Sequence, residues 1–219
     1  MNTSNRPFTA KEELIHSITH GLGALVGVVG LVLLFLRAAV GGVLAITGAA
    51  LFGASIITLY LSSCLYHASC HAQLVGRPMK AAEVFKRMDY CTIFLLILGT
   101  YIPVCWSVLR GALGWVMFGI IAACAVLGIT LNAISPERTH KVSMVIYVAA
   151  GWAIAVASVP FVRTVGLSGF FLLLLGGIFY TLGLIFYSLN KIPYMHVIWH
   201  LFVLAGTVAH YLLIYFYCY

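Results

Sequence analysis

The sequence is poor in charged residues. Only 8% of its 219 residues are charged, whereas soluble domains average about 25%. Apolar residues make up 63%, so the chain is not an ordinary water-soluble globule. The formal net charge of +7 comes from basic residues scattered singly between long apolar runs. This pattern excludes a disordered chain and a nucleic-acid-binding one.

Paired cysteine spacings and alternating strand patterns are also missing. The six cysteines lie singly inside or beside apolar runs, so we expect buried apolar residues and no secreted disulfide framework. No segment of about ten residues shows the alternation of a membrane β-strand. The composition therefore predicts an all-α, polytopic membrane protein.

Seven apolar segments are each long enough to span a bilayer, which takes about 20 residues. We expect a single membrane domain over residues 1–219, in which residues 1–17 form a short cytoplasmic segment. The first span lacks a small-residue cleavage site, so we interpret it as a retained helix and not as a signal peptide. The predicted spans are Ile18–Leu36, Val43–Tyr66, Tyr90–Leu109, Leu113–Ala133, Val142–Val162, Leu167–Leu189 and Met195–Tyr217.

The distribution of lysine and arginine predicts the orientation of these spans. With seven spans, nine of the 12 basic residues fall on the amino-terminal side of the membrane. Because cytoplasmic loops carry the excess of Lys and Arg, we expect the amino terminus in the cytoplasm and the carboxyl terminus outside. This orientation is opposite to that of G-protein-coupled receptors. The longest connection, His67–Asp89, is interpreted as a basic loop near anionic headgroups.

Five polar residues at the ends of three spans are candidates for chemistry, because such residues are costly in a membrane unless they face a partner, cavity or metal. Ser63 and His67 lie four residues apart, as do His196 and His200, so each pair shares a helix face. Asp89 opens the third span. The predicted topology places all five at the cytoplasmic ends of their helices.

The three histidines have two interpretations. Three imidazoles with an open fourth position form the ligand set of a catalytic zinc ion, and a nearby carboxylate can hold or deprotonate its water. Histidines near a helix end also often hydrogen-bond only to headgroups or carbonyls. His71, Cys64 and Cys70 are competing ligands, since zinc accepts both imidazole and thiolate, but we interpret them as lying outside the site. The spacing alone leaves both interpretations open.

Together these motifs resemble the hemolysin III branch of the progestin and adipoQ receptor family, over nearly the whole chain. The resemblance implies a seven-helix fold with a cytoplasmic amino terminus and a zinc ion held by three histidines near that face. It also implies that Asp89 orients or deprotonates the zinc water, and that Ser63 bonds to this water or to the reacting carbonyl. The implied ligands are His67, His196 and His200. The motifs are Glu13–His20, Ser63-x-x-x-His67, Asp89 with the following apolar run to Gly99-Thr100-Tyr101-Ile102-Pro103, and His196-x-x-x-His200.

Three further histidines have less certain roles. His16 departs from the family pattern, which usually has Asn three residues after the glutamate. His20 is interpreted as a residue that hydrogen-bonds at the start of the first span. His210 lies too deep to share the metal, and we expect it to bond to a hydroxyl such as that of Tyr101 or Tyr180.

The sequence predicts a zinc-dependent hydrolase of a lipid amide or ester, with a membrane lipid as substrate or ligand; the wider group implied by the resemblance includes alkaline ceramidases. The non-enzymatic alternatives are a membrane sensor or homeostasis protein with a structural zinc ion, and a pore-forming hemolysin. A pore needs a continuous polar lining, which the spans lack beyond the histidine cluster. We expect the protein in a bacterial inner (plasma) membrane.

Overall fold

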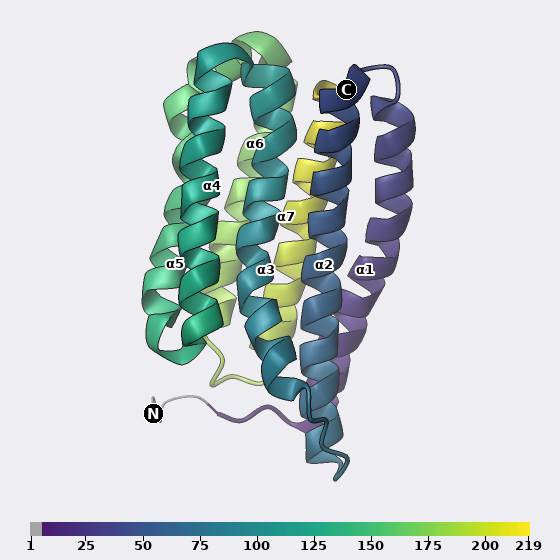
Figure 1. Ribbon diagram of the computed structural model, residues 1–219. Helices are drawn as coiled ribbons and strands as arrows, with labels where there is room; N and C mark the ends of the chain where they lie inside the picture. The colour runs from purple at the N-terminus through teal and green to yellow at the C-terminus, as the bar shows by residue number, and fades with distance from the viewer. Residues whose placement is uncertain (1–5) are drawn as a thin grey trace.

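The structure, a computed structural model, describes residues 6–219, which contain helices and no strand. Figure 1 shows the helices packed lengthwise, with α1 beginning at one end of the bundle and α7 finishing at the other. A π-helical turn, η1, and a 3-10 turn, η2, continue two of the α-helices. The elements are α1 Ala10–Ala38, α2 Gly42–Leu74, α3 Ala82–Pro103, η1 Val104–Leu109, α4 Gly111–Ile134, α5 Pro136–Trp152, η2 Ala153–Ala157, α6 Ser158–Ser188 and α7 Met195–Tyr217.

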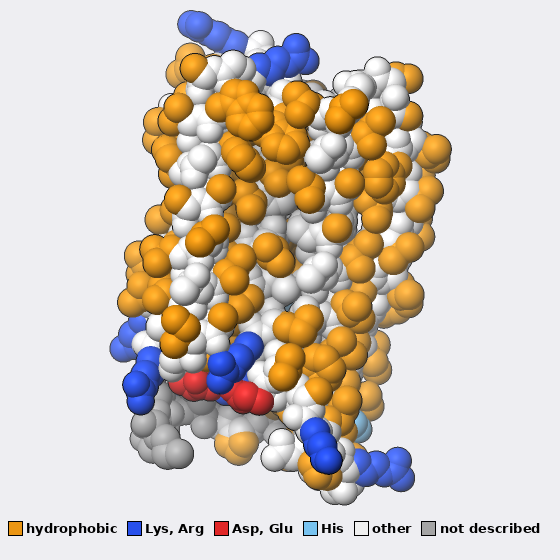
Figure 2. Space-filling view, viewed as in Figure 1, with side chains coloured by type: hydrophobic (Ala, Val, Ile, Leu, Met, Phe, Trp, Pro, Cys, Tyr) orange, Lys and Arg blue, Asp and Glu red, His pale blue; other side chains and the backbone are white. Residues whose placement is uncertain are grey.

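The outer surface of the bundle is apolar. Val40, Val156 and Leu167 expose 94%, 85% and 77% of their area, which would be unfavourable in water. Figure 2 shows apolar side chains over the middle of the molecule, with lysine and arginine confined to its two ends. The chain is an integral membrane protein, as its composition predicts.

Six helical segments of the described chain are long and apolar enough to cross a membrane, compared with seven predicted spans. The difference arises because residues 136–188 form one 53-residue helical segment. Such a helix would be about 80 Å long if straight, far more than the bilayer core of about 30 Å. At Gly166 the segment has non-helical angles, φ 69° and ψ −177°, which glycine adopts readily. Tyr187, near its end, is hydrogen-bonded to His140, near its start, so the segment doubles back.

The first helix begins earlier than predicted. It starts at Ala10, not at Ile18, because Thr9 and Glu12 form a capping box that satisfies free backbone groups of the first turn. The Thr9 side chain accepts a hydrogen bond from the Glu12 backbone, and the Glu12 carboxylate accepts one from the Thr9 backbone. Residues 10–17, predicted to belong to a short cytoplasmic segment before the first span, are therefore part of the first helix.

The prediction of a long loop between the second and third spans is also wrong, because the connection is shorter than expected. α2 continues to Leu74 and α3 already begins at Ala82, so His67 and Asp89 lie within helices and not at their ends. Polar residues with good helix propensity extend both helices beyond their apolar runs. The site described below therefore lies on continuous helices, which hold side chains more rigidly than a loop would.

Candidate metal centre

Four histidines meet at the end of the bundle where α1 begins. His16 comes from α1, His67 from α2, and His196 and His200 from one face of α7. Their ring centres lie 4.7 to 5.4 Å from one another. His16, His67 and His200 are buried and His196 is half-buried.

The predicted ligand set is brought together by this packing. One ligand nitrogen from each of His67, His196 and His200 lies within 4.8 Å of the others, close enough for the three to hold a metal ion. The spacing of four residues places His196 and His200 on the same side of α7. The contact between α2 and α7 needed for the third ring could not be read from spacing.

The two predicted catalytic residues lie beside these histidines. Asp89 and Ser63 line the same cavity as the three rings. Asp89 is not among the side chains whose ligand atoms form a potential metal site in residues 6–219.

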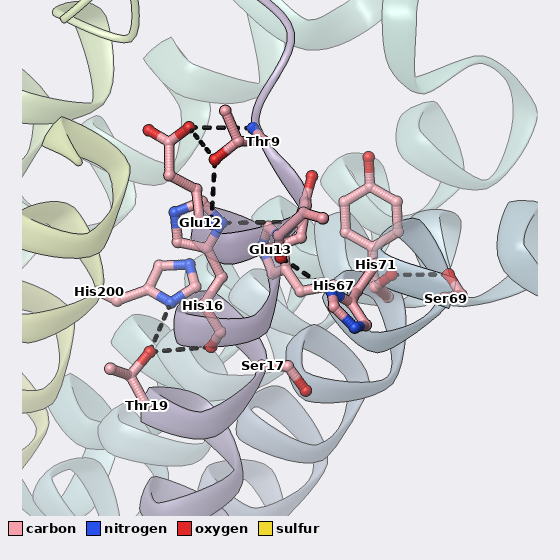
Figure 3. A network of polar contacts seen from close by, with 12 residues as sticks. Thr9, Glu12, Glu13, His16, Ser17, Thr19, His67, Ser69, His71 and His200 are labelled. Carbon is pink, nitrogen blue, oxygen red and sulfur yellow. Dashed lines mark hydrogen bonds and ion pairs between the residues drawn. The ribbon is translucent and has the colours of Figure 1, made fainter. Parts of the chain in front are cut away.

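Glu13 orients His67. The Nδ1 atom of His67 lies 2.6 Å from Oε2 of Glu13, and the ionised carboxylate can only accept, so Nδ1 donates (Figure 3). This bond leaves Nε2 of His67 free to bind a metal. Histidine ligands commonly have such a carboxylate partner, which fixes the ring and raises its basicity.

Thr19 orients His200 in the same way. The Thr19 hydroxyl donates its only hydrogen to the His16 carbonyl at 2.8 Å, so it accepts from Nδ1 of His200 at 3.2 Å. Nε2 of His200 is thereby left for a metal, as it is in His67. Sequence reasoning noted Glu13 and Thr19 only as parts of a motif. At six residues apart they lie about 120° from each other around α1, so their spacing alone does not indicate that both face the histidines.

Unpaired buried nitrogens support the fit of a metal ion to these residues. Both ring nitrogens of His16 and of His20 are buried without a hydrogen-bond partner. Leaving buried polar atoms unpaired is costly, and native proteins rarely do so without a bound ion, water or function. The imidazoles and the adjacent carboxylate are a donor set that suits zinc, copper, iron or nickel.

Two of the other histidines, His20 and His210, differ from the predictions, whereas His71 lies outside the potential metal groups as expected. His20 makes no helix-start hydrogen bond; its ring stacks on that of His200, with centres 3.6 Å apart and planes 9° apart. His210 bonds through Nε2 to the Leu173 carbonyl at 3.1 Å, so the expected hydroxyl partner is wrong. His71 contacts the Ala10 carbonyl through Nδ1 and belongs to neither potential metal group of the described chain.

All six cysteines are free.

A cavity of about 300 Å³ opens beside the centre. At one end it is lined by the three predicted ligands together with Ser63 and Asp89. From there it extends between α3, α5, α6 and α7 to Tyr101, Trp152 and His210, and most of the side chains along it are aliphatic or aromatic. The polar centre thus adjoins an apolar interior.

Arg6 and Phe8, in the segment that precedes α1, also line this cavity. The Phe8 ring contacts His16 and His196, with centres 4.9 and 5.1 Å apart. Glu12 is only 1% exposed, and its carboxylate accepts from the Tyr194 backbone at 2.9 Å and from Arg6. Glu12 therefore joins the amino-terminal segment to the loop between α6 and α7.

The fold and the site define a polytopic helical membrane protein with a histidine-rich centre buried at one end. The sequence model of the family described as Haemolysin-III related matches residues 8–211. The chain belongs to this family, and the resemblance noted from its motifs is confirmed.

Three relatives illustrate the range of this similarity. The chain is 38% identical to the Hemolysin-3 homolog of Bacillus subtilis (strain 168) over 212 residues, 96% of each chain. It is 38% identical to Hemolysin-3 of Bacillus cereus over 208 residues, 94% of this chain and 92% of that one. It is 28% identical to the human Monocyte to macrophage differentiation factor over 172 residues, 77% of this chain and 69% of the relative.

Proposed function

We propose that this protein is a zinc-dependent hydrolase that cleaves an amide or ester bond of a membrane lipid. The observation that supports the proposal is the cavity, which joins the histidines, a carboxylate and a hydroxyl to an apolar interior. Its volume of about 300 Å³ is at the lower end of small-molecule pockets. A lipid carbonyl would lie at the polar end while part of its acyl chain fills the apolar end.

The proposed roles follow from the positions of the side chains. His67, His196 and His200 would hold the zinc ion, with Glu13 and Thr19 fixing two of the rings. Zinc bound by three neutral imidazoles lowers the pKa of water to about 7 and polarises a carbonyl. Hydrolysis would add the water oxygen to the acyl carbon, break the bond between that carbon and the leaving nitrogen or oxygen, and transfer a water proton to the leaving group.

Two cavity residues would manage this proton and the carbonyl group. The Asp89 carboxylate, which lines the cavity, would accept the proton from water and return it to the leaving group. The Ser63 hydroxyl, which lines the same cavity, would donate a hydrogen bond to the water or the carbonyl oxygen. The reaction requires only the lipid and water.

The proposal includes seven membrane spans. Residues 136–188 count as one of the six helical segments. If this segment crosses the membrane twice, with the break at Gly166, the chain has seven spans. The end that holds the histidines would carry nine of the 12 basic residues, which favours a cytoplasmic amino terminus and an exterior carboxyl terminus. The site would then face the cytoplasmic leaflet of a bacterial inner (plasma) membrane, which agrees with the bacterial origin of the Hemolysin-3 relatives.

A second candidate function is a sensor or membrane-homeostasis protein in which zinc has a structural role. The observation that favours it is that the three rings belong to two different helices, α2 and α7, which a metal would tie together. A pore receives less support, because the cavity is mainly apolar beyond its histidine end.

The test of the hydrolase is fatty-acid release from a panel of amide and ester lipids in nanodiscs. We expect turnover that falls on chelation, returns with zinc, and is lost in Asp89→Asn while zinc remains bound. Glu83→Gln is the matched control, because Glu83 is an exposed carboxylate on the same helix. Zinc-loaded protein that hydrolyses no lipid of the panel would favour the sensor. Loss of zinc in Asp89→Asn would make Asp89 a ligand.

A further inference from the structure

We infer that His16 is a fourth, exchangeable metal ligand, which closes the position left open by His67, His196 and His200 when no substrate is bound. The inference rests on the metal site of the proposed function, but not on hydrolysis. No other histidine of the described chain has both the position and the unpaired nitrogens that this role needs.

The first support is the arrangement of the four rings. The centre of His16 lies 4.7, 4.8 and 5.2 Å from those of His67, His196 and His200. The three predicted ligands are themselves separated by 4.8, 5.1 and 5.4 Å. With zinc–nitrogen distances of about 2.0–2.1 Å, four imidazoles around a tetrahedral ion would have ring centres about 5 Å apart. The four rings therefore already form a tetrahedron of the size that one ion requires.

The second support is the state of the His16 side chain. The ring is 0% exposed, and neither nitrogen has a hydrogen-bond partner. Its closest acidic neighbour, Oε2 of Glu13, is 3.5 Å from Nδ1, beyond a good hydrogen bond, and the same oxygen accepts from His67 at 2.6 Å. Coordination would provide the missing partner for one His16 nitrogen.

The structure also explains why this ligand would be the exchangeable one. Glu13 holds His67, Thr19 holds His200, and a nitrogen of His196 already groups with those two rings, whereas His16 has neither a hydrogen bond nor a place in that group. In its present rotation His16 groups with Glu13 and His67, and its nitrogens are not grouped with those of His196 and His200. The torsion about the Cβ–Cγ bond is broad for histidine. Rotation of the His16 ring about this bond would move a ring nitrogen from the side of Glu13 to the side of the metal. Water or substrate would occupy the fourth position while His16 faces Glu13.

His20, four residues along α1, does not compete for this role. Its ring is parallel to His200 at a centre-to-centre distance of 3.6 Å. Two imidazoles bound to one ion at right angles or wider need centres at least about 4.5 Å apart. His20 therefore supports the His200 ring by stacking and cannot share an ion with it in this arrangement.

The test counts imidazoles around zinc by X-ray absorption in the full-length protein, and measures azide binding to the cobalt-substituted form by visible absorption. We expect four imidazoles in wild type and three plus an oxygen ligand in His16→Asn. Azide should bind to His16→Asn at least tenfold more tightly, because the fourth position is then permanently open. His140→Asn is the matched control, since His140 lines the same cavity but bonds to Tyr187, and it should retain four imidazoles.

The possible outcomes separate this inference from the proposed function. Three imidazoles in the wild-type protein, with unchanged azide affinity in His16→Asn, would overturn the inference and leave the hydrolase intact. Two zinc ions per chain would also overturn it, because Glu13, His16 and His67 would then form a separate site. Four imidazoles without turnover of any lipid would support it while removing the hydrolase. The wild-type count decides the inference even where His16→Asn does not fold.

Discussion

Replacement of Glu13 tests how strongly the structure prepares His67 for a metal. The Glu13 carboxylate is 6% exposed, and its Oε2 atom lies 2.6 Å from Nδ1 of His67. In Glu13→Gln the amide oxygen can still accept this hydrogen bond, but the negative charge is lost, and charge-assisted bonds are about twice as strong as neutral ones. In Glu13→Ala both the charge and the acceptor are lost.

Outer-shell partners of metal ligands contribute about 10- to 100-fold to affinity. We therefore expect zinc affinity to fall about tenfold in Glu13→Gln and about 100-fold in Glu13→Ala, which corresponds to about 1.4 and 2.7 kcal/mol. The low exposure of Glu13 favours the upper part of this range, because the charge is poorly screened by solvent.

The measurement is a competition titration with a chromophoric zinc chelator in detergent. Glu12→Gln is the matched control: it removes the same charge one residue away, but the Glu12 carboxylate bonds to Thr9 and the Tyr194 backbone, and not to a metal-site histidine. We expect this control to lower the melting temperature without changing zinc affinity. Wild-type affinity in Glu13→Ala, or an equal loss in Glu12→Gln, would refute a specific role for Glu13.

Three further predictions concern stability. Zinc removal by a chelator should lower the melting temperature measured by scanning fluorimetry, because the metal would join α2 to α7; an unchanged value after confirmed metal loss would contradict this. Tyr101→Phe should destabilise by about 1–3 kcal/mol in denaturant titration, since the hydroxyl accepts from the Ile154 backbone at η2; stability equal to wild type would show that this N–H finds another partner. Gly99→Ala should destabilise by about 1–3 kcal/mol, because its Cβ would lie 2.2 Å from Oγ of Ser55, whereas Gly119→Ala meets no atom within 4 Å and should not destabilise.

The helical membrane fold could be predicted from sequence because long apolar runs allow few other structures. The helix ends could not be predicted equally well. Hydropathy marks the start of the apolar run at Ile18, whereas the helix starts at Ala10 through the Thr9 and Glu12 caps. By contrast, hydropathy places Gly166 in the short connection between the predicted spans Val142–Val162 and Leu167–Leu189, and the structure has a positive φ at this residue.

The same distinction holds for the site. Spacing along α7 was sufficient to pair His196 with His200, because helical periodicity decides which face a residue occupies. The bond between Glu13 and His67 joins residues 54 positions apart and depends on how α1 is rotated against α2. No local pattern specifies that rotation. The role of His16 was unpredictable for the same reason, although its departure from the family pattern was visible.

The attachment of the amino-terminal segment affects how the protein should be produced for study. Phe8 covers two of the histidine rings, and Glu12 fixes that segment to the loop before α7. A purification tag or fluorescent fusion at the amino end would disturb the contact of Phe8 with these rings. A polyhistidine tag there would also bring foreign imidazoles to the metal centre. A fusion after Tyr219 would lie at the opposite end of the bundle (Figure 1). Metal contents and affinities should therefore be measured on carboxyl-terminally tagged or untagged protein.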